Sequence, residues 1–276
     1  MSVFLAIFLG IIQGITEFLP VSSSGHLSIF QNLLNVSAAD DSHLLFDVML
    51  HMGTFISICF SFRRELKRMI SETVSTLRGD GQQNAAPPPS VRMVVLLAIA
   101  TIPLLITIPF YGLIRTLFFH TGFIGFMLLL TGALLFVSVK YLKPGTKNEK
   151  TLTVSDAIMI GLVQAVAVIP GLSRAGATIT VGLSRGAERD FSIRFSLLLS
   201  LPAVLGSLII TLINAISNGI DWSAFPLYLL GLVISAVVGV FAIALTRALM
   251  HEDKWQYFAY YCFGAGLLAI ILSLAL

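Results

Sequence analysis

The stretch that decides the fold is GITEFLPVSSSGH, residues 14–26, which interrupts an otherwise apolar N-terminal segment. Apolar residues dominate 3–19, Pro20 and three consecutive serines then break the run, and a second apolar arm, LSIFQNLLNV, follows. That arm is only about 15 Å long as a helix. A bilayer core about 30 Å thick requires about 20 apolar residues, so this arm cannot cross alone. We therefore predict a re-entrant hairpin over 3–38, with both arms entering and leaving on the same side.

The composition of the whole chain is that of a membrane protein. Of its 276 residues, 57% are hydrophobic and only 11% are charged, and its mean hydropathy is +0.93. Soluble domains carry about 25% charged residues. The apolar windows have helix length and lack the ten-residue alternation of a membrane β-barrel. We predict an all-α polytopic protein forming one membrane domain over 1–276, with six transmembrane helices near 45–62, 93–113, 121–139, 190–214, 226–247 and 256–275.

A second interrupted segment resembles the first. The run DAIMIGLVQAVAVIP leads into GLSRAGATIT and then into charged residues, which predicts a second re-entrant hairpin over 156–188. Three spans follow each hairpin, and an odd number of crossings inverts the second copy relative to the first. We therefore predict an inverted-topology repeat, 1–139 and 152–276, with the two hairpin tips facing each other. An offset of 151 residues aligns Gln13 with Gln164, Ser22 with Ser173, Ser23 with Arg174, and Gly25 with Gly176.

The distribution of basic residues gives an expected orientation. Cytoplasmic loops of membrane proteins are enriched in lysine and arginine. With the first hairpin entering from outside, nearly all basic residues fall on the cytoplasmic side. The N-terminal segment has no basic n-region or Ala-x-Ala-like cleavage site, so we expect it to be retained. The loop containing GDGQQNAAPPPS is expected to be a flexible connector. The basic clusters lie at 63–92, 140–150, 185–194 and 247–254.

The two predicted tips carry residue types that suit an anion. The three serines, Ser22, Ser23 and Ser24, with Gly25, fall at the start of the returning half-helix, where backbone N–H groups and the helix dipole favour negative charge. Ser173 is the equivalent N-cap in the second tip, and Gly176 permits close backbone approach. Arg174 offers a planar fork suited to phosphate oxygens.

Arg174 requires a reason to lie inside a membrane, because insertion there costs about 2.5–3.5 kcal/mol. One alternative is a purely structural ion pair with Glu17. Two serine-capped helix starts are not needed for such a pair, and an anionic phosphate ligand explains all of these groups together.

The same residues suggest hydrolytic chemistry. Ser23 is the better nucleophile candidate, with His26 as base or as acid for the leaving group, and a phosphohistidine at His26 stays open. Gln13 and Glu17 are one helical turn apart, and their oxygens suit Mg²⁺ or Ca²⁺. A divalent ion would add the positive charge that a single arginine lacks for a diphosphate. In FDVMLHMGT, Asp47 and His51 are expected to be helix-end residues lining the mouth.

The two motifs QGITEFLPVSSSGH and PGLSRAGATI closely resemble the signatures of the bacterial undecaprenyl pyrophosphate phosphatases, the bacitracin-resistance family. The resemblance extends through nearly the whole chain. It implies an enzyme of the plasma (inner) membrane that removes one phosphate from undecaprenyl diphosphate on the external face and recycles this lipid carrier for wall synthesis. It also implies a divalent-metal requirement, bacitracin resistance through competition for the same lipid, and an inverted-repeat fold.

Carried over by position, the family motifs assign site residues in this chain. This chain departs from the family at Gln13, where many members have a carboxylate, at Ala175, where serine is common, and at Ser24, where threonine is usual. The first motif contributes Gln13, Glu17, Ser22, Ser23 and His26, and the second contributes Ser173, Arg174, Gly176 and Thr178.

Two rival functions fit parts of the pattern. A transporter or lipid flippase is also built from inverted repeats with half-helices at the midplane, but carrying a substrate requires no nucleophile. The type-2 phosphatidic acid phosphatase class needs a histidine soon after its Ser-Arg pair, and none follows Ser173–Arg174 until His251. The expected partners are the polyprenyl diphosphate lipid and membrane lipids, with no nucleic acid. A homodimer, the substrate chain length and the preferred ion stay open.

Overall fold

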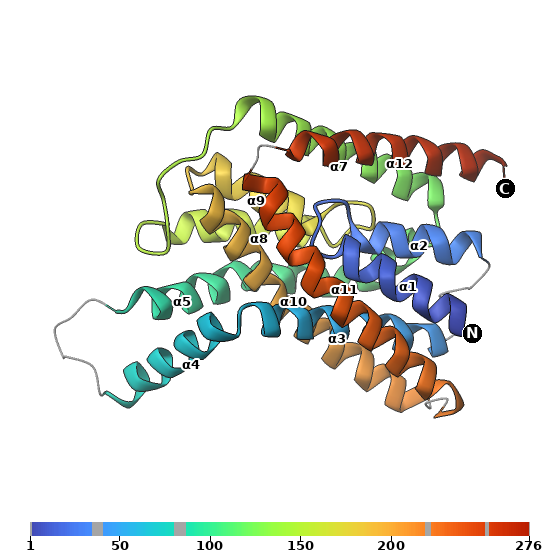
Figure 1. The fold of residues 1–276 in the computed structure, drawn as a ribbon, viewed down its shortest axis with the longest axis horizontal. Coiled ribbons are helices and arrows are strands. Elements are labelled where there is room, and N and C mark those ends of the chain that lie inside the picture. Colours follow the sequence, from blue (N-terminus) through green and yellow to red (C-terminus); the bar gives the residue numbers. More distant parts are fainter. Residues whose placement is uncertain (1, 35–40, 80–86, 219–221, 252–253, 276) are drawn as a thin grey trace.

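The structure is a computed structural model that describes residues 2–34, 41–79, 87–218, 222–251 and 254–275. The connector residues 80–86 and the end of the first predicted hairpin, 35–38, lie outside these ranges. The described chain is helical, with one isolated β-bridge between Lys147 and Ala187. Its elements (Figure 1) are α1 Val3–Thr16, α2 Ser23–Leu33, α3 Asp41–Ser61, α4 Arg63–Arg78, α5 Pro89–Thr101, η1 Ile102–Phe110, α6 Tyr111–Leu117, α7 Thr121–Tyr141, α8 Val154–Val166, α9 Arg174–Ser184, α10 Arg189–Asn218, η2 Trp222–Ala224, α11 Phe225–His251 and α12 Trp255–Ala275.

The described residues contain five helical segments long and apolar enough to cross a membrane. A sixth is counted when α3 and α4, which meet at a 79° bend, are taken as one broken span. The prediction of an all-helical polytopic membrane protein is therefore confirmed, with five or six spans. The interrupted segments begin with short apolar helices, α1 of 14 residues and α8 of 13. The five spans are Pro89–Leu117, Thr121–Tyr141, Arg189–Ile209, Phe225–Leu249 and Trp255–Ala275.

The short helices are held among the long ones. Helix α1 packs against α11, whereas α8 packs against α5 and η1. Helix α3 contacts both α10 and α11, and α7 and α12 lie side by side along one edge of the bundle (Figure 1). A Cβ added at Gly125 of α7 would lie 2.7 Å from the Gly266 carbonyl oxygen of α12, so small residues permit this close contact.

The outer surfaces of the spans are apolar. Phe126 and Val137 of α7, Phe241 of α11, and Leu267 and Ile271 of α12 are all exposed. Contiguous apolar surface of this kind is rare on soluble monomers and fits contact with lipid tails.

A buried carboxylate fixes the start of the second hairpin. Asp156 accepts hydrogen bonds from Lys147 Nζ at 2.8 Å and Arg185 Nε at 2.7 Å, and it forms a capping box with Thr153 at the N-terminus of α8. Burial of the Asp156 carboxyl opposes ionisation, but these partners hold its pKa below the ordinary value. The cluster ties the loop before α8 to the end of α9.

Candidate active site

The two hairpin tips meet at their glycines. A Cβ added at Gly25 would lie 2.9 Å from the Cα of Gly171, closer than real side chains approach backbone. Gly171 has φ +96°, a left-handed conformation that favours glycine, and a Cβ there would lie 2.5 Å from the Ile124 carbonyl oxygen. The tips, about 150 residues apart in sequence, are therefore in backbone contact, as the sequence predicted.

Both returning helices begin with a capping serine. Ser22 Oγ accepts from the Gly25 N–H at 3.3 Å, and Ser173 Oγ accepts from the Gly176 N–H at 3.1 Å. The predicted N-caps are confirmed. Among the non-glycine residues that the structure describes, Ser22 alone has a positive φ, +72°. Such a conformation costs about 1–3 kcal/mol and typically occurs at functional sites.

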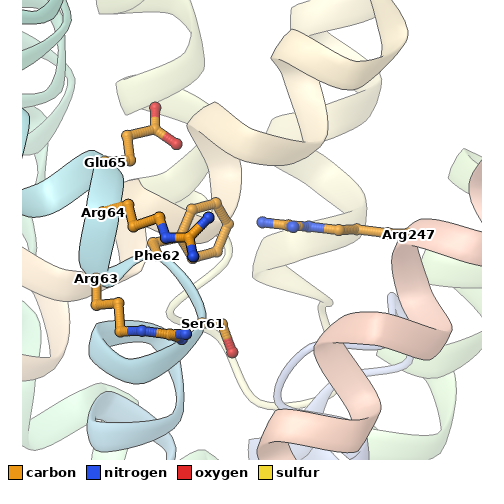
Figure 2. A pocket seen from close by; sticks show the side chains of 6 residues that line it. All are labelled: Ser61, Phe62, Arg63, Arg64, Glu65 and Arg247. Atoms are coloured by element: carbon orange, nitrogen blue, oxygen red, sulfur yellow. The ribbon is translucent and has the colours of Figure 1, made fainter.

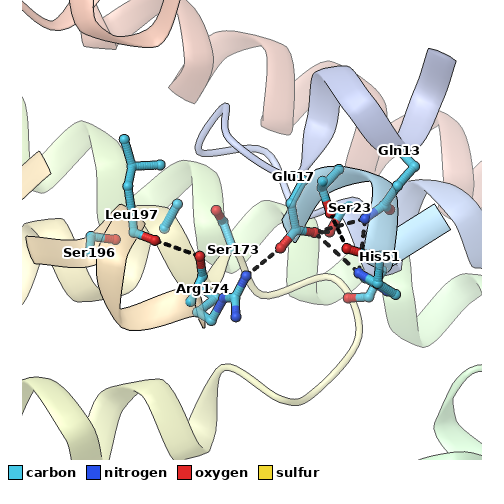
Figure 3. A network of polar contacts seen from close by, with 12 residues as sticks. Gln13, Glu17, Ser23, His51, Ser173, Arg174, Ser196 and Leu197 are labelled. Atoms are coloured by element: carbon cyan, nitrogen blue, oxygen red, sulfur yellow. Dashed lines mark hydrogen bonds and ion pairs between the residues drawn. The ribbon is translucent and has the colours of Figure 1, made fainter. Parts of the chain in front are cut away.

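The Glu17 carboxylate is the centre of the polar network. Its Oε1 accepts from Arg174 Nη2, and its Oε2 accepts from Ser23 Oγ at 2.5 Å and Gln13 Nε2 at 3.1 Å. Figure 3 shows Glu17 between Arg174 on one side and Ser23 on the other. The ion pair considered from the sequence is therefore formed. The Arg174 side chain is 24% exposed, and only one of its nitrogens makes this contact, so its fork retains donors.

His26 is held by groups other than Ser23. Its Nδ1 lies 2.7 Å from the Ser22 carbonyl oxygen, which can only accept, so Nδ1 carries a proton. Its Nε2 lies 2.8 Å from Tyr261 Oη, and the two rings stack with centroids 5.6 Å apart. From the sequence we expected Ser23 to act with His26, but in the structure the Ser23 hydroxyl donates its hydrogen bond to Glu17.

Two site residues were not recognised from the sequence. Tyr261 belongs to α12, and no local pattern distinguishes it from the neighbouring tyrosines. His51 was expected at the mouth, but its Nδ1 lies 2.9 Å from Gln13 Nε2 and 3.7 Å from Glu17 Oε2. The one-turn spacing of Asp47 and His51 was the available signal, since it places both on one face of α3.

Two predicted substrate-binding hydroxyls lie at the edge of this network. Thr178 Oγ1 lies 2.8 Å from the Arg174 carbonyl oxygen and 2.6 Å from Ser196 Oγ, so it joins α9 to α10. Ser24 Oγ is 3.5 Å from Ser22 Oγ. Neither hydroxyl contacts Glu17, and the contact of Thr178 with Arg174 is to the backbone carbonyl of that residue.

The oxygen donors partly suit a divalent cation. Gln13 Oε1 is buried and has no hydrogen-bond partner among the described residues. Glu17 is the adjacent carboxylate, but Arg174 and Ser23 already contact both its oxygens. Within the described ranges, no group of three or more His, Cys, Asp or Glu residues is placed to hold a metal. A Mg²⁺ or Ca²⁺ ion would therefore need further oxygen ligands from substrate or water.

Two serine-capped half-helices meeting inside a bundle of spans define a multi-pass membrane protein with a buried, charge-paired site. The profile described as "Bacitracin resistance protein BacA" matches residues 6–268, and the chain belongs to this family. Proteins named undecaprenyl-diphosphatase are similar to it. That of Methanobrevibacter smithii is 39% identical over 77% of this chain and 77% of its own. That of Desulforapulum autotrophicum is 36% identical over 79% of this chain and 80% of its own. That of Halothermothrix orenii is also 36% identical, over 84% of this chain and 83% of its own.

Proposed function

We propose that the protein hydrolyses undecaprenyl diphosphate to undecaprenyl phosphate and inorganic phosphate. The names of its relatives supply the substrate. The observation that carries the chemistry is the position of Ser23, whose Oγ lies 2.5 Å from Glu17 Oε2 while the other Glu17 oxygen contacts Arg174. A hydroxyl beside a carboxylate base and an arginine suits attack on phosphorus.

The first step uses the Ser23 hydroxyl as nucleophile. Its oxygen forms a bond to the terminal phosphorus, its proton passes to Glu17, and the bond from that phosphorus to the bridging oxygen breaks. Undecaprenyl phosphate leaves with the bridging oxygen. Glu17 releases that proton to solvent as the lipid phosphate departs. Water then attacks the phosphorus of the phosphoserine and gives a proton to Glu17, the bond from phosphorus to Ser23 Oγ breaks, and Glu17 returns this proton to the Ser23 oxygen as inorganic phosphate leaves.

The charges around Ser23 stabilise the phosphoryl group. Helices α2 and α9 both begin at the meeting tips, so their N-terminal dipoles favour an anion there. The free donors of Arg174 bind non-bridging phosphate oxygens. Gln13 and Glu17 would hold a divalent ion, which supplies charge neutralisation when bound.

His26 is placed to assist departure of the lipid phosphate. The Ser22 carbonyl fixes its Nδ1–H, which leaves Nε2 and the Tyr261 hydroxyl as a pair able to hold or pass a proton. The same Nε2 is the alternative nucleophile. Trapping the phosphoenzyme and locating its phosphate separates phosphoserine at Ser23 from phosphohistidine at His26.

The packing supports the inverted repeat, which we propose as 1–139 and 152–276. Under that symmetry α3 corresponds to α10 and α7 to α12, and each of these pairs is in contact. Helix α1 packs on α11 as α8 packs on α5, the equivalent pairing. The returning helices α2 and α9 both have 11 residues and the same cap.

We place the site toward the external face of the plasma membrane, because the basic loops belong on the cytoplasmic side. The enzyme then recycles the lipid carrier for wall synthesis. It confers bacitracin resistance by competing for the same lipid diphosphate.

The test is phosphate release by purified protein in detergent from undecaprenyl diphosphate, with Mg²⁺ or Ca²⁺ and with a chelator. We expect release with the ion, loss with the chelator, and loss in Ser23→Ala. Ser28→Ala is the matched control, because Ser28 lies on the same helix and bonds only the Ser24 carbonyl. Lipid movement across liposomes without phosphate release would overturn the proposal in favour of a flippase.

A further inference from the structure

A cavity lies away from the proposed active site, at the break between α3 and α4. It has a volume of about 350 Å³. It is lined by Ser61, Phe62, Arg63, Arg64, Glu65 and Arg247 (Figure 2). An adjoining cavity of about 250 Å³ shares Glu65 and Arg247 with it and adds Asp190, Ile193 and Arg194. None of these residues belongs to the Glu17 network.

Two of the three arginines that line this cavity contact aromatic rings. The Arg247 guanidinium lies 4.3 Å from the centroid of the Phe62 ring. Figure 2 shows it extending from α11 toward Arg64 and that ring. Arg63 lies 4.8 Å from the Phe60 centroid and donates to the Phe60 carbonyl at 2.9 Å. Stacking of this kind positions a guanidinium while leaving edge donors available.

The cavity carries a surplus of positive charge. Three arginines line it with one carboxylate, Glu65. The Glu65 carboxylate lies 3.5 Å from a fourth arginine, Arg194, and so forms an ion pair outside the set of three. Arg194 also pairs with Glu149 at 2.7 Å. No side chain caps the N-terminus of α4, and its dipole adds positive potential beside Arg63 and Arg64.

The cavity also lies at the ends of two apolar helical segments. It directly follows the apolar stretch Leu45–Ser61, and Arg247 is two residues before the end of the span Phe225–Leu249. The ends of membrane spans are expected near the boundary between hydrocarbon and water, where phosphate groups of phospholipids lie. An arginine guanidinium can donate two parallel hydrogen bonds to two oxygens of one phosphate. Arginines gathered around a cavity therefore suit a phosphate group better than basic residues scattered along a solvated loop.

We propose that this cavity is a binding site for a phosphate group, carried by an anionic phospholipid headgroup or by a free phosphate ion. Arg247 and Arg64 hold the phosphate oxygens, and Phe62 supports Arg247. Ser61 and Glu65 both line the cavity, but among the described residues the Ser61 hydroxyl makes no hydrogen bond to Glu65, so we expect phosphate to bind there without reacting. The proposal is independent of the hydrolysis at Ser23.

The test is thermal unfolding of the purified full chain in detergent, with phosphatidylglycerol, with phosphatidylcholine, or with inorganic phosphate. We expect phosphatidylglycerol to raise Tm by several degrees more than phosphatidylcholine, and Arg247→Gln and Arg64→Gln each to lose most of that difference. Arg78→Gln is the control: it removes one positive charge from the exposed last turn of α4, and this variant should keep the Tm difference between the two lipids. A shift with inorganic phosphate that Arg247→Gln abolishes identifies free phosphate as a ligand; a shift with phosphatidylglycerol alone identifies the lipid.

Two results would overturn the proposal. One is an equal loss in Arg78→Gln, which would mean that general surface charge produces the shift. The other is a wild-type protein unaffected by any phosphate probe. If Arg247→Gln does not fold, Arg64→Gln is compared with wild type instead. Arg247→Lys then tests whether the planar guanidinium is needed: it keeps the positive charge but should lose most of the Tm shift.

Discussion

Replacing Glu17 by glutamine tests the proposed base directly. The substitution keeps the shape of the side chain but removes its charge, so the oxygen that accepts from Ser23 at 2.5 Å becomes a weak acceptor or an amide donor. General-base catalysis contributes about 10²–10⁴-fold in rate, which corresponds to about 2.7–5.4 kcal/mol of barrier at about 1.36 kcal/mol for each factor of ten. We expect kcat for phosphate release to fall by about that factor.

The assay separates this role from metal binding. If Glu17 acts on Ser23, raising Mg²⁺ or Ca²⁺ should not restore the rate of Glu17→Gln, because the lost proton acceptor is not replaced. If Glu17 only holds the ion, the variant should recover at high metal concentration. Gln13→Ala is the comparison, since Gln13 shares the candidate metal position but does not contact Ser23. A Glu17→Gln rate within threefold of wild type, or full recovery with metal, would refute the base assignment.

Three further predictions follow from particular contacts. Tyr261→Phe removes the hydroxyl 2.8 Å from His26 Nε2. It should lower kcat by about 2–10-fold, given about 0.5–1.5 kcal/mol for a hydrogen bond between neutral groups, and it should change the pH–rate profile; an unchanged profile would mean that Tyr261 only packs against His26. Gly25→Ala places a Cβ 2.9 Å from Gly171 and should lower stability by about 1–3 kcal/mol and activity with it, measured by thermal unfolding and phosphate release; equal stability would contradict the close tip contact. Asp156→Asn should destabilise the fold by about 2–3 kcal/mol. Removing one partner of a fully buried ion pair costs about 3–5 kcal/mol, and the loss is smaller here because the Lys147 and Arg185 side chains are 34% and 41% exposed. Since its folded pKa is depressed, this stabilisation is present above the ordinary carboxyl pKa and fades as pH falls, so the Tm difference should shrink in acid; a constant difference would argue against the ion cluster.

Local patterns were sufficient for much of the fold. Apolar run lengths located the spans, and Ser22 and Ser173 were identified as N-caps because a cap depends on the backbone within three residues of it. The contact between Gln13 and Glu17 followed from a one-turn spacing on one helix. Each of these features is determined by neighbours in the sequence.

Other features depended on helices that the sequence does not relate. The apolar run ends at Phe62 in the sequence, but only the packing brings Arg63 and Arg64 beside Arg247 of α11 to form the arginine cavity. Tyr261 reaches His26 only because α12 packs beside the first hairpin.

The sequence by itself determined that the chain is a helical membrane protein with two interrupted hairpins, because hydrophobic length and capping chemistry act over one or two turns. Only the tertiary structure showed which side chain the Ser23 hydroxyl contacts, which is Glu17. From the sequence, His26 was the expected partner of Ser23, and Glu17 was expected to hold a metal ion. The Ser22 carbonyl and the Tyr261 hydroxyl contact the two ring nitrogens of His26, while Glu17 contacts both Arg174 from the second hairpin and Ser23. Side-chain direction in a packed core is set by contacts between distant segments, which no local pattern encodes.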